Sequence, residues 1–105
     1  MIDLEQQWLD EIIAILRRHA PQCEAWAFGS RVRGKAEQHA DLDVVLVGPE
    51  PLPWEDLEAL KEGFAESDLP VIVDVHDWQA IPEDSQRRIS EEHEVLKQAE
   101  MAKGS

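Results

Sequence analysis

Apolar residues recur every three or four positions near the N-terminus, over residues 8–16. This spacing places their side chains on one face of a helix. We therefore predict an amphipathic helix over residues 3–19, which ends before a proline. Asp3 and Gln6 have the spacing of a capping box at the start of this helix.

The same spacing predicts two further helices. One covers residues 54–66, and its apolar face consists of Trp54, Leu57, Leu60 and Phe64. The other is a charged C-terminal helix that begins at Pro82, carries Ile89 and Leu96, and frays after Ala99.

Three short apolar runs, residues 23–28, 41–47 and 70–76, predict strands. With a short helical segment after Gly29, the element order becomes α-β-(short α)-β-α-β-α. This order predicts an α/β (α+β) fold in which a small mixed three-stranded sheet is flanked by helices. A chain of 105 residues has room for one hydrophobic core, so we take residues 1–105 as a single domain.

Composition narrows the class of function. The formal net charge of -13 repels a phosphate backbone, so direct nucleic-acid binding is not expected, whereas a basic partner protein would suit this surface. No apolar run reaches the roughly 18 residues of a membrane span, and no signal-peptide pattern opens the chain. A single cysteine, Cys23, fits a reducing compartment. We expect a cytoplasmic protein without membrane association.

Two aspartates open the second predicted strand. Asp41 and Asp43 are two positions apart, so their side chains point to the same face, with alpha carbons about 6.6 Å apart. Two carboxylates this close repel each other unless a cation lies between them, and Mg²⁺ suits such oxygen ligands. The alternative is a strand end with two solvated aspartates.

A third aspartate lies in the last predicted strand. Asp74 is flanked by valines, where a buried carboxylate would need a partner. It would share a metal or accept the proton of an attacking hydroxyl. The alternative is a hydrogen bond to a tryptophan or to backbone. His76 and Asp77 compete for the same role, and we rank both below Asp74.

The turn between the first two predicted strands is suited to phosphate. Gly29 lets backbone N–H groups approach an anion closely, and Ser30 adds a hydroxyl donor. Arg31, Arg33 and Lys35 form a basic island in an acidic chain, which fits a small anionic ligand such as a nucleoside triphosphate.

Two other motifs in the sequence are incomplete. Residues 29–36 approach the P-loop pattern, but Ala36 lacks the hydroxyl that would hold Mg²⁺ and a strand, not a helix, follows. Arg88 and His93 have the spacing of the HEPN ribonuclease signature, but no helical bundle surrounds them, and a solvated helix face explains them better.

Gly29-Ser30, ten intervening residues and Asp41-Leu42-Asp43 together form the pattern G-S-x10-D-x-D. Residues 28–46 thereby resemble the minimal nucleotidyltransferases (MNT) of the DNA polymerase β superfamily, which are paired with HEPN toxins in type VII toxin–antitoxin systems. Ala40 departs from the serine that is usual at its position in that family.

The resemblance implies a function and a set of residue roles. The activity would be the transfer of AMP from ATP to a hydroxyl, often a tyrosine, of a cognate HEPN ribonuclease, with which the chain would form a hetero-oligomer. Gly29 and Ser30 would hold the triphosphate with help from Arg31 and Arg33. The catalytic and metal-binding residues would be Asp41, Asp43 and Asp74, which would hold two Mg²⁺ ions.

Two other functions fit the same sequence. An acidic antitoxin could neutralise its partner by binding alone, without catalysis. A nucleotidyltransferase could instead modify a small molecule such as an aminoglycoside, although a chain of this length has no second domain to enclose such an acceptor.

Overall fold

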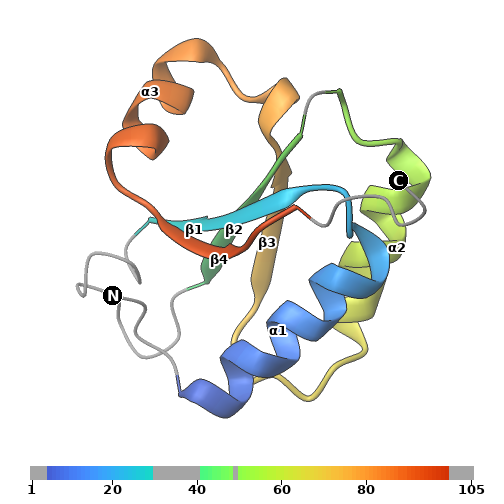
Figure 1. Ribbon diagram of the computed structural model, residues 1–105. Coiled ribbons are helices and arrows are strands. Elements are labelled where there is room, and N and C mark those ends of the chain that lie inside the picture. The colour runs from blue at the N-terminus through green and yellow to red at the C-terminus, as the bar shows by residue number, and fades with distance from the viewer. Residues whose placement is uncertain (1–4, 30–40, 49, 100–105) are drawn as a thin grey trace.

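A four-stranded sheet runs through the middle of the molecule (Figure 1). The structure is a computed structural model that describes residues 5–29, 41–48 and 50–99. In chain order, the elements are α1 (Gln6–His19), β1 (Glu24–Phe28), β2 (Leu42–Val47), α2 (Trp54–Ala65), β3 (Val73–Asp77), the 3-10 helix η1 (Trp78–Ala80), α3 (Glu83–Glu91) and β4 (Glu94–Lys97).

The strand order is β3-β2-β1-β4, and the sheet is mixed. β1 pairs antiparallel with both β2 and β4, whereas β2 and β3 are parallel and are connected through α2. β3 and β4 are therefore the edge strands. The predicted α/β class with a mixed sheet is confirmed, with one strand more than the sequence indicated.

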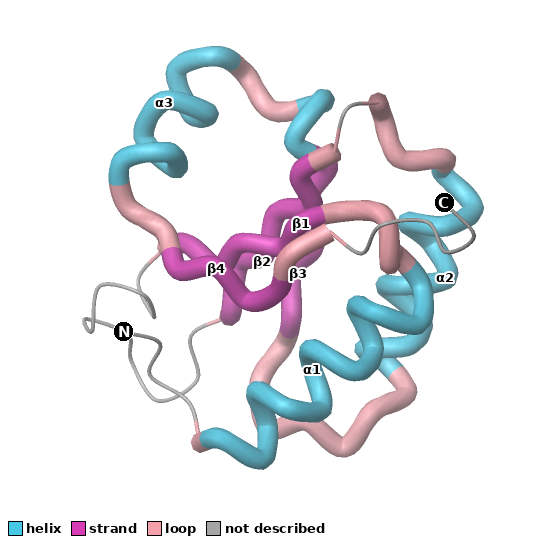
Figure 2. Tube along the Cα trace, in the orientation of Figure 1, coloured by secondary structure: helices cyan, strands magenta, loops and turns pink. Residues whose placement is uncertain are grey.

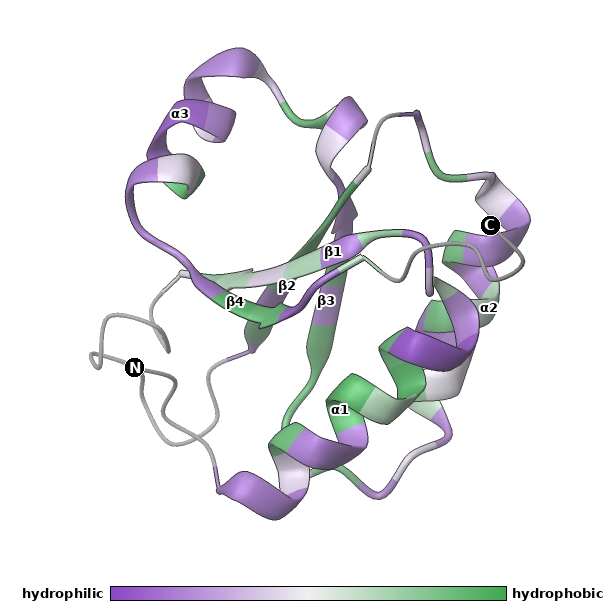
Figure 3. Ribbon diagram, viewed as in Figure 1, coloured by the Kyte–Doolittle hydropathy of each residue, from purple (hydrophilic) through white to green (hydrophobic). Residues whose placement is uncertain are grey.

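The two faces of the sheet have different environments. One face packs against α1 and α2, which lie side by side, and α3 lies on the other side of the strands (Figure 2). The main core lies between the sheet and α1 and α2. Its fully buried members include Ile12, Leu16, Leu42, Val44, Leu46 and Leu60. The apolar residues of the strands and α1 contrast with the mostly hydrophilic α3 in Figure 3.

Alternation along the strands assigns the remaining side chains to the second face. In β2, Leu42, Val44 and Leu46 belong to the core cluster, so Asp43 and Val45 point the other way. Trp26 of β1 is opposite Val45, and its ring contacts Trp78 and stacks on His93 at a centroid distance of 3.9 Å. These aromatic contacts join η1 and the end of α3 to the second face.

Several predicted element boundaries need correction. The C-terminal helix predicted from Pro82 to Ala99 ends at Glu91, and the chain then forms β4, because pairing with β1 satisfies its backbone groups. The third strand begins at Val73 rather than at residue 70. Trp54 is 71% exposed at the start of α2 and is not part of its buried face.

The helix predicted over residues 3–19 begins at Gln6 in the structure, and Asp3 of the predicted capping box lies outside the described residues. Within the described ranges, no helix has both the length and the apolar character that crossing a membrane would require.

Lys97 at the end of β4 is buried, with 6% of its surface exposed. Its ammonium group donates hydrogen bonds to the carbonyl oxygens of Ala20 at 3.0 Å, Pro21 at 3.4 Å and Cys23 at 2.5 Å. Most of the side chain is therefore buried, and the hydrogen bonds of its ammonium group connect β4 to the turn between α1 and β1.

We predict that Lys97→Met lowers the free energy of unfolding by about 2 kcal/mol, because the carbonyl groups of the turn lose a charged donor. Urea unfolding monitored by tryptophan fluorescence would measure the change. Lys61→Met, at an exposed position of α2, is the matched control and should change stability by less than about 0.5 kcal/mol. Equal stability of K97M and the unmodified chain would contradict the prediction.

Candidate metal and nucleotide site

The register between β2 and β3 brings two carboxylates together. Asp43 of β2 is opposite Asp74 of β3 in the parallel ladder. Both residues alternate with core residues, so both side chains lie on the sheet face that α1 and α2 leave open. Neighbouring strands are about 4.8 Å apart, and two acidic groups at this separation favour a cation between them.

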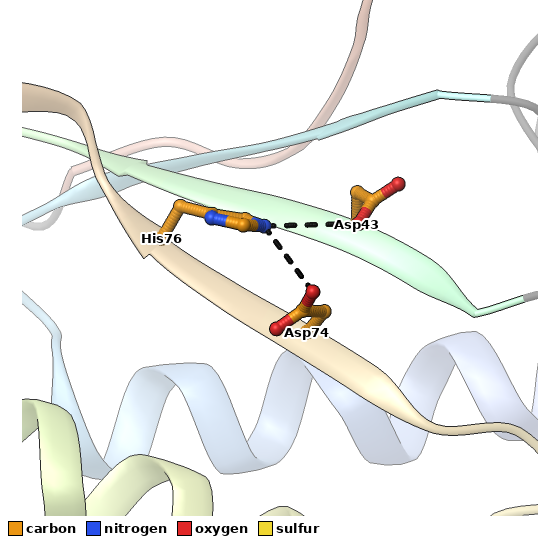
Figure 4. Close-up of side chains that lie close together, drawn as sticks. All are labelled: Asp43, Asp74 and His76. Carbon is orange, nitrogen blue, oxygen red and sulfur yellow. Dashed lines mark ion pairs between the residues drawn. The ribbon is translucent and has the colours of Figure 1, made fainter. Parts of the chain in front are cut away.

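His76 completes the cluster. It lies two residues after Asp74 on the same face of β3, and the three side chains point toward one another (Figure 4). Its Nε2 atom is 3.7 Å from Asp43 Oδ1 and 3.6 Å from Asp74 Oδ2. One ligand atom from each residue lies within 4.8 Å of the other two.

The environment of His76 is partly apolar. Its ring is 5.6 Å from the ring of Phe28, centroid to centroid, and its Nε2 atom is buried, with no hydrogen-bond partner within 3.5 Å among the described residues. The side chain of Asp43 is the main cause that raises the pKa of His76 above its usual 6.5, and the charge of Asp74 adds to this effect, whereas burial opposes it.

Gly29 lies directly against Asp43. It follows β1 with a φ of +92°, and a Cβ atom at this position would lie 2.6 Å from Asp43 Oδ2. Only glycine combines this backbone conformation with such a close approach. Asp43 thus contacts the glycine turn through one carboxylate oxygen and faces His76 through the other.

An open pocket of about 550 Å³ adjoins this turn. Phe28 and Gly29 form one side, and residues of α3 and the segment after it form the other, among them Arg88. The volume is within the range of pockets that hold small ligands. It lies beside the carboxylate cluster because Gly29 borders both.

The structure brings together only part of the predicted set. Asp43 and Asp74 meet, but Asp41 lies just before β2, is exposed, and does not belong to the group formed with His76. Ser30, Arg31 and Arg33 lie outside the described residues, as do Lys35 and the predicted short helix.

Asp74 and Asp77 differ in their surroundings on the sheet. Asp77 accepts hydrogen bonds from the backbone N–H groups of Leu52 and Gln79, both at 3.1 Å. It alternates with His76 and so points away from the cluster. Asp77 therefore stabilises the turn into η1, and Asp74 is the carboxylate next to Asp43.

The expectation that Asp74 is buried was wrong. Its side chain is 54% exposed, because β3 is an edge strand and only its Val73 and Val75 side chains face the helices. The flanking valines indicated a strand buried on both faces, whereas one face is open. His76, which the sequence analysis ranked below Asp74, lies in the same cluster. The signal in the sequence was the spacing Asp74-x-His76, which puts both side chains on one face of a strand. Asp41-x-Asp43 has the same spacing.

The cluster fits a divalent cation. A metal ion satisfies two carboxylates and a buried imidazole nitrogen together, and all three groups are common metal ligands in proteins. The three side chains come from two paired strands, so the backbone fixes their relative positions.

We predict that Gly29→Ala lowers the free energy of unfolding by about 1–2 kcal/mol, because alanine is strained at a positive φ. Its Cβ would also displace the Asp43 carboxylate, so the side-chain NMR signals of Asp43 and His76 should shift. Gly63→Ala in α2 is the control, since it lacks a positive φ and should leave these signals in place. Unchanged Asp43 signals in G29A would contradict the described contact.

We predict that His76 in the metal-free chain titrates above pH 6.5, and that Asp43→Asn lowers its pKa more than Asp74→Asn does. Folding raises this pKa, so the stability that His76 contributes is complete below about pH 6.5 and is lost as the pH rises through the folded-state value. An NMR titration of the imidazole C–H signal in EDTA measures the pKa. Asp10→Asn, an exposed change on α1, should not shift it.

Comparisons with known proteins identify the family. The nucleotidyltransferase domain family matches residues 9–97. The chain is also 39% identical over 99 residues to the probable protein adenylyltransferase MntA of Haemophilus influenzae, and this alignment covers 94% of this chain and 87% of that protein.

Solved structures share the fold. A chain from the crystal structure of a toxin–antitoxin with AMP-PNP matches with a TM-score of 0.73 at 22% identity, over 86% of this chain and 73% of that one. A chain from the tri-AMPylated Shewanella oneidensis HEPN toxin in complex with MNT antitoxin matches with a TM-score of 0.62 at 19% identity, over 90% of this chain and 73% of that one. The resemblance carried by residues 28–46 is confirmed: this chain belongs to the nucleotidyltransferase domain family.

Proposed function

We propose that this chain transfers AMP from ATP to a hydroxyl group of a HEPN-class ribonuclease, in a reaction that depends on divalent metal, and thereby acts as the antitoxin of that protein. The observation that carries the proposal is the contact of Gly29 with Asp43, which is itself paired with Asp74. A glycine turn for phosphate and two metal-binding carboxylates are thereby adjacent in space, as nucleotidyl transfer requires.

In this proposal the acidic residues have separate tasks. Asp43 would hold the metal together with Asp41, which lies just before the same strand. Asp74 lies on the far side of Asp43 from the glycine turn and either shares the metal or accepts the proton of the attacking hydroxyl. The bound metal supplies charge stabilisation at the α-phosphate and at the leaving pyrophosphate.

The nucleotide is held by the other half of the site. Backbone N–H groups at Gly29, together with the Ser30 hydroxyl, bind the triphosphate, and Arg31 and Arg33 neutralise its charge. We place the nucleoside in the pocket between Gly29 and α3, where Arg88 supplies a further cation.

The reaction forms one bond and breaks another. The acceptor oxygen bonds to the α-phosphorus, and the bond from that phosphorus to the β-phosphate oxygen breaks, which releases pyrophosphate. The hydroxyl proton passes to the Asp74 carboxylate where that group acts as the base, and to solvent where Asp74 shares the metal. ATP carries all the energy that the step requires, and no redox change occurs.

Three observations support a protein acceptor. The relative from Haemophilus influenzae is named a probable protein adenylyltransferase, and one structural match is a complex of MNT antitoxin with an AMPylated HEPN toxin. Asp74 lies on an edge strand and is exposed, so a large acceptor can reach it. The net charge of -13 favours a basic partner surface. A tyrosine is the acceptor that we propose.

We predict that label from α-labelled ATP, and not from γ-labelled ATP, reaches the partner ribonuclease in the presence of divalent metal. Asp43→Asn and Asp74→Asn should each lower the rate by at least about 100-fold, because each change removes several kcal/mol of transition-state stabilisation. Asp10→Asn is the charge-matched control and should retain full activity. Transfer of γ-label would indicate a kinase and contradict the proposal.

The same variants test how the partner is neutralised. If AMP transfer is the antitoxin activity, a chain with Asp41→Asn and Asp43→Asn fails to protect cells that express the ribonuclease. Full protection by this folded double variant would show neutralisation by binding alone.

A further inference from the structure

We propose that His76 is a direct nitrogen ligand of the metal in this site, and that the site therefore prefers a first-row transition cation such as Mn²⁺ over Mg²⁺. The inference rests on the proposed function only in placing a divalent cation beside Asp43 and Asp74. It concerns the identity of that cation and the residue that selects it.

The ion pairs between His76 and the two carboxylates are longer than hydrogen bonds and leave room for a shared cation. His76 Nε2 lies 3.7 Å and 3.6 Å from the nearest oxygens of Asp43 and Asp74. A charge-assisted hydrogen bond between imidazolium and carboxylate would bring these atoms to about 2.7–2.9 Å. Two ligands of one metal, with bonds of about 2.0–2.2 Å, lie about 3–3.6 Å apart for angles between 90° and the tetrahedral value. The observed distances of 3.6 and 3.7 Å lie at and just above the upper end of this range.

The burial of Nε2 gives an independent reason. This atom is excluded from solvent and has no hydrogen-bond partner in the part of the chain that the structure describes, although part of the ring is exposed. A buried polar atom without a partner is rare in a folded protein and requires an explanation, such as an ion. A cation between the three side chains would satisfy Nε2 and one oxygen of each carboxylate together.

Neighbouring residues hold these ligands in place. The ring of Phe28 packs against the imidazole at 5.6 Å, with the two planes 54° apart. Gly29 lies against Oδ2 of Asp43, and Oδ1 of the same carboxylate is directed toward His76. Asp74 and His76 share one strand and one face, which fixes their separation. The donor set is thus arranged before any metal binds.

The chemistry of the donors determines the metal preference. Mg²⁺ takes oxygen ligands and retains water, whereas imidazole nitrogen binds transition ions more strongly. Two carboxylates alone would serve Mg²⁺ well. The added nitrogen should raise the affinity for Mn²⁺ while giving Mg²⁺ little advantage.

Electron paramagnetic resonance of Mn²⁺ added to the full chain without nucleotide tests this directly. We expect echo modulation from a coordinated ¹⁴N nucleus, and labelling the histidines with ¹⁵N should replace it with the ¹⁵N pattern. His76→Gln should abolish the modulation and lower the Mn²⁺ affinity by at least about tenfold, with little change for Mg²⁺. His19→Gln, in α1 on the opposite side of the sheet, should retain both.

The outcomes separate this inference from the proposed function. Bound Mn²⁺ without nitrogen modulation in the unmodified chain would overturn the inference, even if AMP transfer occurs. Absence of Mn²⁺ binding would overturn it as well. Nitrogen modulation that depends on His76, in a chain that transfers no AMP, would support the inference and contradict the proposed function.

Discussion

The parallel pairing of β2 with β3 places Asp43 beside Asp74, and the rest of the site depends on this register. A slip of one residue would turn one of the two carboxylates toward the core, where it would lie among valine and leucine side chains. The core residues that alternate with these aspartates therefore fix the site as well as the fold. Burial of Val44 and Val75 on one face determines which groups meet on the other.

One face of the sheet contains the hydrophobic core, and the other contains the candidate site. The face covered by α1 and α2 contains most of the buried apolar residues, and no aspartate belongs to that core cluster. Among the described elements, η1 and α3 lie on the other face, where the side chains of Asp43 and Asp74 are 32% and 54% exposed. The repulsion between Asp43 and Asp74 is a cost that the core offsets in the absence of a cation.

Much of this arrangement was predictable from local patterns. The spacing of apolar residues predicted α1 and α2, and the apolar runs predicted the three strands that carry Gly29, Asp43 and Asp74. The pattern G-S-x10-D-x-D predicted the family. These features depend on residues close together in sequence, where periodicity and turn chemistry act directly.

The errors arose where distant parts of the chain decide the structure. β4 is a short strand in a charged segment, and its pairing with β1 and the anchoring of Lys97 determine its conformation. Asp74 is exposed because β3 is at the edge of the sheet. The valines on either side of Asp74 in the sequence do not indicate an edge strand. His76 lies close to Asp43 only because β2 pairs with β3. Each of these outcomes required the strand order, which the sequence reasoning did not specify.

The edge position of β3 has a consequence for the behaviour of this protein in concentrated solution. An edge strand of a sheet can pair with a strand of a second copy, and Ile72, 69% exposed beside β3, would add an apolar contact. Asp74 opposes such self-association, because the stacking of two strands would bring like charges together. A carboxylate at this position would therefore disfavour the pairing of two β3 edges as well as serve the candidate site.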